Sequence, residues 1–330
     1  MSAGIEIGAR KRLYLVSGRF NRGLAERIGE NLGVELSEAN VSSFANGEIH
    51  CRFTDSIRGG DVFIVQSHGA DESGSVNDAL IEQLIMVDAA RRASAKRISV
   101  VVPFYGYARQ DRKSEGREPI TARLVANLFE TAGADRLLSV DLHSGQIQGF
   151  FNGPVDHLTA MPVLASYLAD LGEDVVVVSP DAGRVKAAER YAKLLHADLA
   201  IVYKRRKKGE KNSVEALAVV GDVEGRTCVL IDDMIDTAGT MVAAAHQLKA
   251  AGATRVLAAA THAVLSGPAI DRLKNSAIEK VVITDTLPLP PEKQIDKIEV
   301  VSVAPLFASA IRAVFEEASV SELFDGNNLS

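Results

Sequence analysis

The sequence predicts an α/β protein of two domains, each with a mainly parallel sheet flanked by helices. Short β-branched runs alternate with Ala- and Leu-rich amphipathic stretches over nearly the whole chain, which is typical of parallel α/β architecture. The chain has 330 residues, and single hydrophobic cores seldom grow that large, so two domains are expected. A weak internal repeat agrees with two domains: a strand, a strand followed by a basic segment and a strand followed by an acidic residue occur in this order twice.

Strands are expected where β-branched residues cluster between turn-forming residues. They are Leu13–Ser17, Val62–Gln66, Ile98–Pro103, Leu137–Leu142, Val175–Ser179, Ala200–Tyr203, Cys228–Ile231, Val256–Thr261, Val281–Thr284 and Val300–Val303. The amphipathic stretches between them predict helices at Gly23–Leu32, Asn77–Ala93, Thr121–Thr131, Ala160–Leu171, Arg184–Leu195 and Met241–Ala251. The turn-forming triplet Asn152-Gly153-Pro154 suggests a boundary between domains 1–152 and 153–304, with the segment of about 305–325 packing back on the first domain.

Composition narrows the class of protein. A content of 47% hydrophobic and 24% charged residues indicates a soluble globular chain, and a net charge of -6 argues against general nucleic-acid binding. Cys51 and Cys228 are too far apart to suggest a disulfide framework or a zinc site. The N-terminus lacks an apolar signal core and no apolar run approaches the ~18 residues of a membrane span, so a cytoplasmic protein without membrane partners is expected.

Residues 229–240 predict a sugar-phosphate site. An apolar strand runs into Asp232 and Asp233, and the small-residue turn Asp236-Thr237-Ala238-Gly239-Thr240 then opens a helix. Backbone N–H groups and hydroxyls of such a turn can hold a phosphate in line with the helix dipole. The two acids are placed to hold ribose hydroxyls or a hydrated cation. The alternative is a strand-turn-helix corner with capping residues and no ligand. The twelve residues resemble the phosphate- and ribose-binding motif of the phosphoribosyltransferase fold.

Other polar segments follow the predicted strands at their carboxyl ends, the edge where ligands bind in open α/β sheets. Residues 103–118 include Arg109-Gln110-Asp111, and their basic and amide groups suit a polyphosphate and a base edge. A solvated, salt-bridged loop is the competing interpretation. His143 follows the predicted strand at 137–142, and Asp181 is the last residue of Ser179-Pro180-Asp181, at the end of another predicted strand. Together they offer an imidazole and a carboxylate to Mg²⁺. A lone histidine in such a place is more often structural than a ligand, and Mg²⁺ generally prefers oxygen ligands.

A basic run and an Asn-Gly turn complete the candidate segments. Six of the eight residues from Lys204 to Lys211 are basic, and a run that follows a buried-type strand suits a flap closing cations over phosphates. Solvated charge is the usual alternative, and RNA binding is the rival function, although only Tyr203 is nearby for base stacking. Phe44-Ala45-Asn46-Gly47-Glu48 is typical of a hairpin turn, whose flanking Phe and Glu hint at stacking on a base and accepting from its exocyclic amine.

Taken together, these motifs resemble the ribose-phosphate pyrophosphokinase family, the phosphoribosyl pyrophosphate synthetases, in its phosphate-dependent, magnesium-using class. The resemblance runs from about residue 12 to 325, with the motifs in the same order. It implies two phosphoribosyltransferase-like domains and an enzyme that transfers the β,γ-diphosphoryl group of ATP to the anomeric hydroxyl of ribose 5-phosphate. The products would be phosphoribosyl pyrophosphate and AMP, for nucleotide biosynthesis. A homohexamer, phosphate activation and ADP inhibition are also implied.

The resemblance assigns roles to matching positions. The ATP-binding segments are resembled by Phe44, Asn46, Gly47 and Glu48 and by Arg109, Gln110 and Asp111. The family's magnesium positions match His143 and Asp181, and its catalytic loop matches Lys204 and Arg206. The ribose 5-phosphate site matches Arg206, Asp232, Asp233 and Asp236–Thr240. One departure is Arg184, which stands where the family usually has the second glycine of a pair after Ser-Pro-Asp.

Two other functions compete. A phosphoribosyltransferase that consumes phosphoribosyl pyrophosphate would use the 229–240 motif but leaves the first domain unexplained. A non-catalytic regulatory subunit or nucleotide sensor is expected to have altered metal or flap positions, whereas His143, Asp181, Lys204 and Arg206 are all present. Neither a Walker A pattern nor a Gly-x-Gly-x-x-Gly fingerprint occurs, which disfavours P-loop kinases and dinucleotide enzymes.

Overall fold

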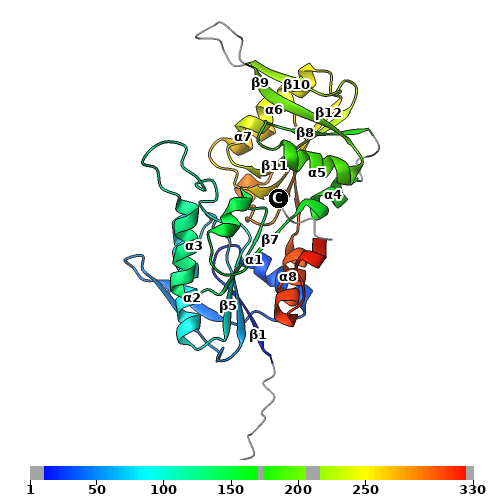
Figure 1. The fold of residues 1–330 in the computed structure, drawn as a ribbon. Coiled ribbons are helices and arrows are strands. Elements are labelled where there is room, and N and C mark those ends of the chain that lie inside the picture. The colour runs from blue at the N-terminus through cyan, green and yellow to red at the C-terminus, as the bar shows by residue number, and fades with distance from the viewer. Residues whose placement is uncertain (1–10, 170–171, 173, 206–215, 325–330) are drawn as a thin grey trace, which may run out of the picture. The chain divides into compact units, whose positions relative to one another are not determined.

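The computed structural model describes residues 11–169, 172, 174–205 and 216–324, with the side chains of 204, 205 and 216 left out. The chain divides into two compact units (Figure 1). The first comprises the chain up to Ser139, Gln146–His157 and the C-terminal stretch from Phe307. The second comprises Val140–Gly145 and Leu158–Leu306. The loop after β6 (Arg136–Val140) therefore belongs to the second unit, although the strand itself lies almost wholly in the first.

The first unit is built on a five-stranded sheet in the order β1-β4-β5-β6-β7, in which β1, β4, β5 and β6 pair in parallel. Its strands are β1 (Leu13–Ser17), β4 (Asp61–Val65), β5 (Arg97–Val102), β6 and β7 (Val155–Leu158). Figure 1 shows α2 (Val76–Arg92) and α3 (Thr121–Ala132) on one face, with α1 (Arg22–Leu32) and α8 (Ala304–Glu316) on the other. The antiparallel hairpin of β2 (Ala39–Ser43) and β3 (Ile49–Phe53) contacts α2.

Local sequence explains where these elements begin and end. Ser75 and Asp78 form a reciprocal capping box at the start of α2, while Gly33 and Gly133 end α1 and α3 in the left-handed conformation that glycine adopts without strain. The 3-10 turn Ser321–Phe324 and, apart from Gly145, the 3-10 turn Gly145–Gly149 also belong to this unit. Polar contacts tie its two ends together, because Arg312 donates to the carbonyl of Leu32 and Lys11 pairs with Glu317 at 2.6 Å.

The second unit has a seven-stranded sheet in the order β10-β9-β8-β11-β12-β13-β14, parallel except where β10 runs antiparallel to β9. Its strands are β8 (Val175–Ser179), β9 (Asp198–Arg205), β10 (Ala216–Val220), β11 (Thr227–Ile235), β12 (Arg255–Ala263), β13 (Lys280–Thr284) and β14 (Ile298–Val301). Helices α4 (Met161–Ala169) and α5 (Val185–Leu195) cover one face, and α6 (Gly239–Ala250) and α7 (Ala269–Lys274) cover the other. Pro291–Lys293 forms a 3-10 turn.

The core of the second unit explains the apolar runs. All five residues of β8 are buried, as expected for a central parallel strand covered on both faces. Three alanines of β12 and three residues of α6 fill one side of the same core: Ala258, Ala260, Ala263, Met241, Ala244 and Leu248. This packing brings the carboxyl ends of β8, β11 and β12 to one edge of the sheet.

The fold prediction of mainly parallel sheets flanked by helices is confirmed, but several boundaries were wrong. β11 continues through Asp232 and Asp233 to Ile235 instead of ending at Ile231, because β12 pairs with it as far as Ala263. β6 ends at Val140, since Asp141 turns into a positive φ of 40°. β14 lies two residues earlier than expected and α6 begins at Gly239 instead of Met241.

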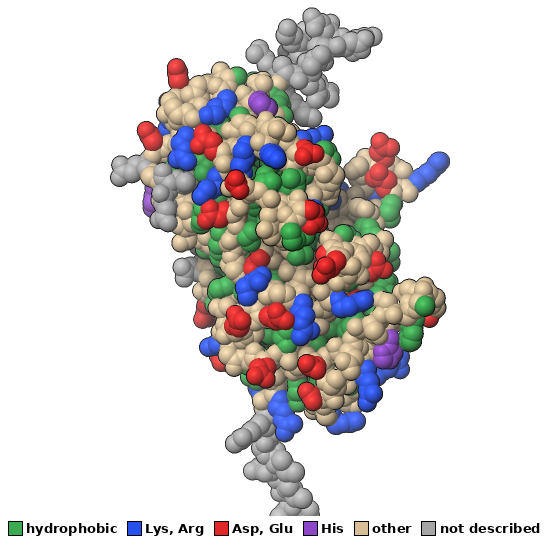
Figure 2. Space-filling model, turned by 180° about the vertical axis from the view of Figure 1, so that it is seen from behind, with side chains coloured by type: hydrophobic (Ala, Val, Ile, Leu, Met, Phe, Trp, Pro, Cys, Tyr) green, Lys and Arg blue, Asp and Glu red, His purple; other side chains and the backbone are tan. Residues whose placement is uncertain are grey.

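The described surface carries charges of both signs. On the face in Figure 2, basic and acidic side chains are interspersed, without a continuous area of one sign. None of the helices among the described residues is long and apolar enough to cross a membrane.

Candidate active site

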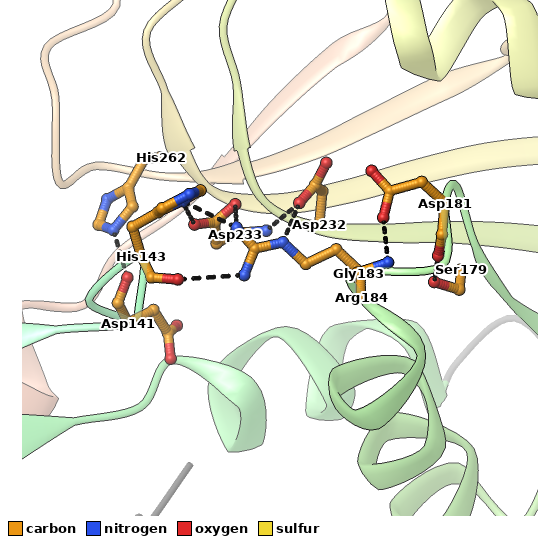
Figure 3. Close-up of polar contacts among 9 residues, drawn as sticks. All are labelled: Asp141, His143, Ser179, Asp181, Gly183, Arg184, Asp232, Asp233 and His262. Carbon is orange, nitrogen blue, oxygen red and sulfur yellow. Dashed lines mark hydrogen bonds and ion pairs between the residues drawn. The ribbon is translucent and has the colours of Figure 1, made fainter. Parts of the chain in front are cut away.

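Two adjacent acids of β11 form the centre of the candidate site in the second unit (Figure 3). The pairing of β11 with β8 ends at Leu230, so Asp232 and Asp233 extend past the end of that neighbour. The side chain of Asp232 is 16% exposed and that of Asp233 is 9% exposed. Burying two carboxylates side by side is costly unless cations or donors face them.

Arg184 and His143 supply those partners. Arg184 Nε lies 3.0 Å from Asp232 Oδ1, and its Nη2 lies 2.7 Å from Asp233 Oδ1. His143 Nδ1 lies 2.8 Å from Asp233 Oδ2 and also 2.8 Å from Arg184 Nη2. A carboxylate can only accept a hydrogen bond and a guanidinium can only donate one. His143 Nδ1 can therefore donate to Asp233 when it carries a proton or accept from Arg184 when it does not, but it cannot do both at once.

The two acids differ in protonation. Burial, and then the charge of Asp233, raise the pKa of Asp232 although Arg184 lies beside it. Burial also acts to raise the pKa of Asp233, but the hydrogen bond with His143 and the charge of Arg184 outweigh it, so that pKa is lowered. The pair therefore holds its negative charge mainly on Asp233.

The loop that carries His143 is fixed to the second unit through Asp141. The Asp141 carboxylate accepts from Thr261 Oγ1 at 2.6 Å and from the backbone N–H of Ala160 at 3.0 Å. His262 Nε2 donates to the carbonyl of Asp141 at 3.1 Å, because a carbonyl oxygen only accepts. Burial lowers the pKa of His262, which favours the neutral ring in this position. These contacts hold the strained Asp141 backbone and orient the chain toward His143.

Asp181 lies on the turn before α5. It is exposed, its Oδ1 accepts from the backbone N–H of Gly183 at 2.7 Å, and its carbonyl accepts from Ser179 Oγ at 2.6 Å. In Figure 3 Asp181 and His143 lie at opposite ends of the group, with the Arg184 side chain between them. Within the described ranges, no three His, Cys, Asp or Glu side chains are arranged to hold a metal ion.

The predicted phosphate turn connects β11 to α6. Ala238, the N-cap residue of the helix, is in the left-handed conformation, with φ 58°, and makes no side-chain capping hydrogen bond. An alanine at this position offers no acceptor of its own to the first N–H groups of α6, which suits an anion site. Arg272 of α7 donates to the carbonyl of Thr237 at 2.9 Å and would lie 3.4 Å from a Cβ added at Gly239. It thus brings a positive charge to this turn.

The basic flap is only partly described. Lys204 lies in β9, but its side chain is outside the described atoms, and Arg206 lies outside the described residues.

The remaining predicted residues lie in the first unit. Phe44 is 57% exposed at the β2–β3 turn, where Glu48 N donates to Asn46 Oδ1 at 3.2 Å and Gly47 has a φ of 90°. A hollow of about 430 Å³ is lined there by Phe44, Gly47, Glu48 and residues of α2. Arg109 and Gln110 are exposed, whereas Asp111 is buried and accepts from Gln146 Nε2 at 2.8 Å.

A buried histidine holds the backbone just before Arg109. His68 Nδ1 accepts from the N–H of Gly106 at 3.1 Å, and Nε2 lies 2.8 Å from Oε1 of Gln83. Gln83 in turn donates to the carbonyl of Ile64 at 2.9 Å, and the ring of Phe129 stacks on His68 with centroids 5.8 Å apart. Burial lowers the pKa of His68 to about 4, so the ring is neutral and can accept from Gly106.

The structure thus brings together Asp232, Asp233 and His143, and places Asp181 on the neighbouring turn. Sequence reasoning missed the contacts of Arg184, Asp141, His262 and Arg272. Two signals were present: Asp141 opens the Asp-Leu-His segment, and Arg184 stands out as a charged residue after Gly183. His262 and Arg272 gave no distinguishing pattern.

Comparisons with known proteins agree with these motifs. Residues 13–133 match the N-terminal domain of ribose phosphate pyrophosphokinase, and residues 211–325 match a phosphoribosyl synthetase-associated domain. Ribose-phosphate pyrophosphokinase of Streptomyces avermitilis is 56% identical over 98% of this chain and 99% of its own. The Bifidobacterium longum protein of the same name is 54% identical over 98% of this chain and 96% of its own.

A solved structure supports the same conclusion. Phosphoribosylpyrophosphate synthetase from Mycobacterium smegmatis superposes with a TM-score of 0.86 and 50% identity, covering 93% of this chain and all of that one. Because both family models match and relatives more than half identical extend along nearly its full length, the chain belongs to the ribose-phosphate pyrophosphokinase family.

Proposed function

We propose that this chain is a ribose-phosphate diphosphokinase. It transfers the β,γ-diphosphoryl group of ATP to the anomeric hydroxyl of ribose 5-phosphate and forms 5-phosphoribosyl 1-pyrophosphate and AMP. The observation that carries the proposal is the β11–α6 segment, where a partly buried acid pair near the end of the strand is followed by a turn whose N-cap residue, Ala238, provides no capping side chain. Family membership makes the sugar phosphate the ligand of choice for that segment.

On the sugar side, Asp236–Thr240 would hold the 5-phosphate through backbone N–H groups and hydroxyls, with the N-terminus of α6 directed at it. Asp232 and Asp233 would accept hydrogen bonds from ribose hydroxyls and orient the anomeric hydroxyl. The β11–β12 pairing supports this role, because it holds both acids on a strand of the sheet and not on a loop.

On the nucleotide side, Arg109 and Gln110 would contact ATP, and the exposed Phe44 with Asn46, Gly47 and Glu48 would receive an adenine. The buried Asp111 would act by holding the segment through Gln146. Lys204 and Arg206 would close over the transferring group and neutralise its charge. Positioning and charge neutralisation suffice for this transfer, and no side chain is required as a general base.

Magnesium is the proposed cofactor, with His143 and Asp181 as its predicted protein ligands. The donor chemistry near His143 fits a hard cation, because the Asp233 carboxylate lies 2.8 Å from its Nδ1 and Asp232 precedes Asp233 on the same strand. Bound Mg²⁺ would neutralise phosphoryl oxygens during transfer.

Further properties follow from the family resemblance alone. They are a homohexameric assembly, activation by phosphate, inhibition by ADP, a cytoplasmic location and a role in nucleotide biosynthesis. Sedimentation with and without phosphate tests the assembly.

Labelled ATP tests the reaction. With Mg²⁺, phosphate and ribose 5-phosphate, label in the γ-phosphoryl group should appear in phosphoribosyl pyrophosphate, with one AMP formed per label transferred. Formation of ADP would indicate a γ-kinase and contradict the proposal. No AMP, together with consumption of added phosphoribosyl pyrophosphate by a nucleobase, would favour a phosphoribosyltransferase. ATP binding without turnover would favour a nucleotide sensor.

A further inference from the structure

Arg184 is a cation of the chain itself, located among the residues proposed for sugar and metal. It directly precedes α5 and follows the Asp181–Gly183 turn. From there its guanidinium reaches both acids of β11 and the ring of His143, at 3.0, 2.7 and 2.8 Å. Its Nη1 also lies 3.4 Å from the carbonyl of His143 (Figure 3).

These contacts use the atoms that a ligand would need. A divalent cation that binds Asp233 Oδ1 must take a position next to Arg184 Nη2, which is 2.7 Å from the same oxygen. Two cations a few ångströms apart repel each other strongly in a partly buried site. A ribose hydroxyl that donates to Asp232 Oδ1 likewise competes with Arg184 Nε for that atom.

In this scheme the arginine would leave by rotation of its own side chain. Its side chain is 20% exposed and comes from a residue that precedes the helix, next to the exposed Asp181, Ala182 and Gly183. Rotation about its side-chain bonds would carry the guanidinium into solvent. Leaving a buried acid pair without any cation is costly, so departure is favourable only when another cation replaces it.

We propose that Arg184 is an internal counter-cation of Asp232 and Asp233, which competes with a divalent cation for the acid pair and thereby sets the metal affinity of the substrate-free site. This inference rests on the proposed function, which assigns the sugar to the acid pair and magnesium to the neighbouring His143. Arg184 is a positioning residue in this scheme, since it acts on the acids and not on the reacting atoms.

The test uses Mn²⁺ as the probe and needs no turnover. Free Mn²⁺ is counted by its electron paramagnetic resonance signal as the full-length protein is titrated without nucleotide or sugar. Arg184→Ala should lower the Kd for Mn²⁺ by about tenfold or more, because the competing charge is gone. Lys186→Ala is the matched control: it removes one positive charge from a position two residues further along the chain, and Kd should stay within about twofold.

A double substitution locates the effect at the acid pair. In an Asp233→Asn background, the gain from Arg184→Ala should shrink to less than about threefold, since the oxygen for which both cations compete has lost its charge. Arg184→Gln retains much of the length of the side chain and serves if the alanine variant does not fold. It too should bind Mn²⁺ more tightly than the wild type.

Unchanged or weaker Mn²⁺ binding in the Arg184 variants would overturn the inference. So would an equal gain with Lys186→Ala, because the effect would then be general electrostatics. The outcome of this test can be told apart from that of the labelled-ATP assay. If the wild type forms AMP but the Arg184 variants bind Mn²⁺ no more tightly, only the counter-cation role is rejected. If the Arg184 variants bind Mn²⁺ more tightly but the wild type forms no AMP, only the diphosphokinase activity is rejected.

Discussion

Replacement of His68 with Asn should remove a pH dependence from the stability of the first unit. The introduced amide could offer its oxygen to the N–H of Gly106 in place of the ring Nδ1, but it cannot take up a proton near neutral pH. In the wild type, burial lowers the pKa of His68 from 6.5 to about 4. The unfolded chain therefore binds a proton between these pH values that the folded chain does not bind.

The direction in which stability changes with pH follows from this difference in proton binding. The His68 contribution to the free energy of unfolding is complete above pH 6.5, falls as pH drops toward 4, and is constant below that value. The gap between these two pKa values corresponds to about 3 kcal/mol in total, of which about 2 kcal/mol is lost by about pH 5. The wild type should thus lose about 2 kcal/mol more than His68→Asn between about pH 7.5 and about pH 5.

The assay is urea unfolding followed by far-ultraviolet circular dichroism at both pH values. His68→Asn should be less stable than the wild type at the higher pH, because the stack on Phe129 is lost, and the gap should narrow at the lower pH. His246→Asn, at an exposed position of α6, is the matched control and should keep the wild-type slope. A His68 resonance that titrates near pH 6.5 in the folded protein would refute the reasoning, as would an unchanged slope in His68→Asn.

Three other substitutions test the second unit. Asp233→Asn keeps the shape of the side chain but removes its charge, so AMP formation should fall by about 100-fold or more while the circular dichroism spectrum is retained; near-normal turnover would exclude a role for this acid. Ala238→Gly relieves a φ of 58° and should raise the free energy of unfolding by about 0.5 kcal/mol, measured with urea; a loss of stability would show that the turn is not strained. Lys204→Ala should abolish turnover yet leave ATP binding, measured by calorimetry, largely intact; unchanged turnover would remove the flap from the mechanism.

The strands of the second unit were largely predictable, because burial on both faces selects continuous β-branched residues. Val175–Ser179 is such a run, and the structure has β8 at those residues. β11 was harder to delimit, since Asp232 and Asp233 resemble the polar end of a strand. Their carboxylates are balanced by Arg184 and His143, which come from distant parts of the sequence, so the local pattern contained no sign that the strand continues.

The candidate site was predictable where its parts are contiguous. The turn at Asp236–Thr240 could be identified from adjacent small and polar residues alone. The contact of Arg184 with Asp233 depends on the order β8-β11 in the sheet, and that of His262 with Asp141 depends on where the loop after β6 lies. Neither follows from residue spacing, because both join segments that only the tertiary fold brings together.

The assignment of Val140–Gly145 to the second unit has a practical consequence for dissecting the protein. A contiguous fragment of residues 158–306 would contain the seven-stranded sheet but lack His143, so Asp233 would lose its imidazole partner and Thr261 and His262 would lose Asp141. Supplying the missing loop as a separate peptide would have to overcome the entropy of ordering it. A fragment of residues 140–306 in which a short linker replaces residues 146–157 keeps the loop covalently attached, and it is therefore a better way to study this half on its own than truncation at residue 158.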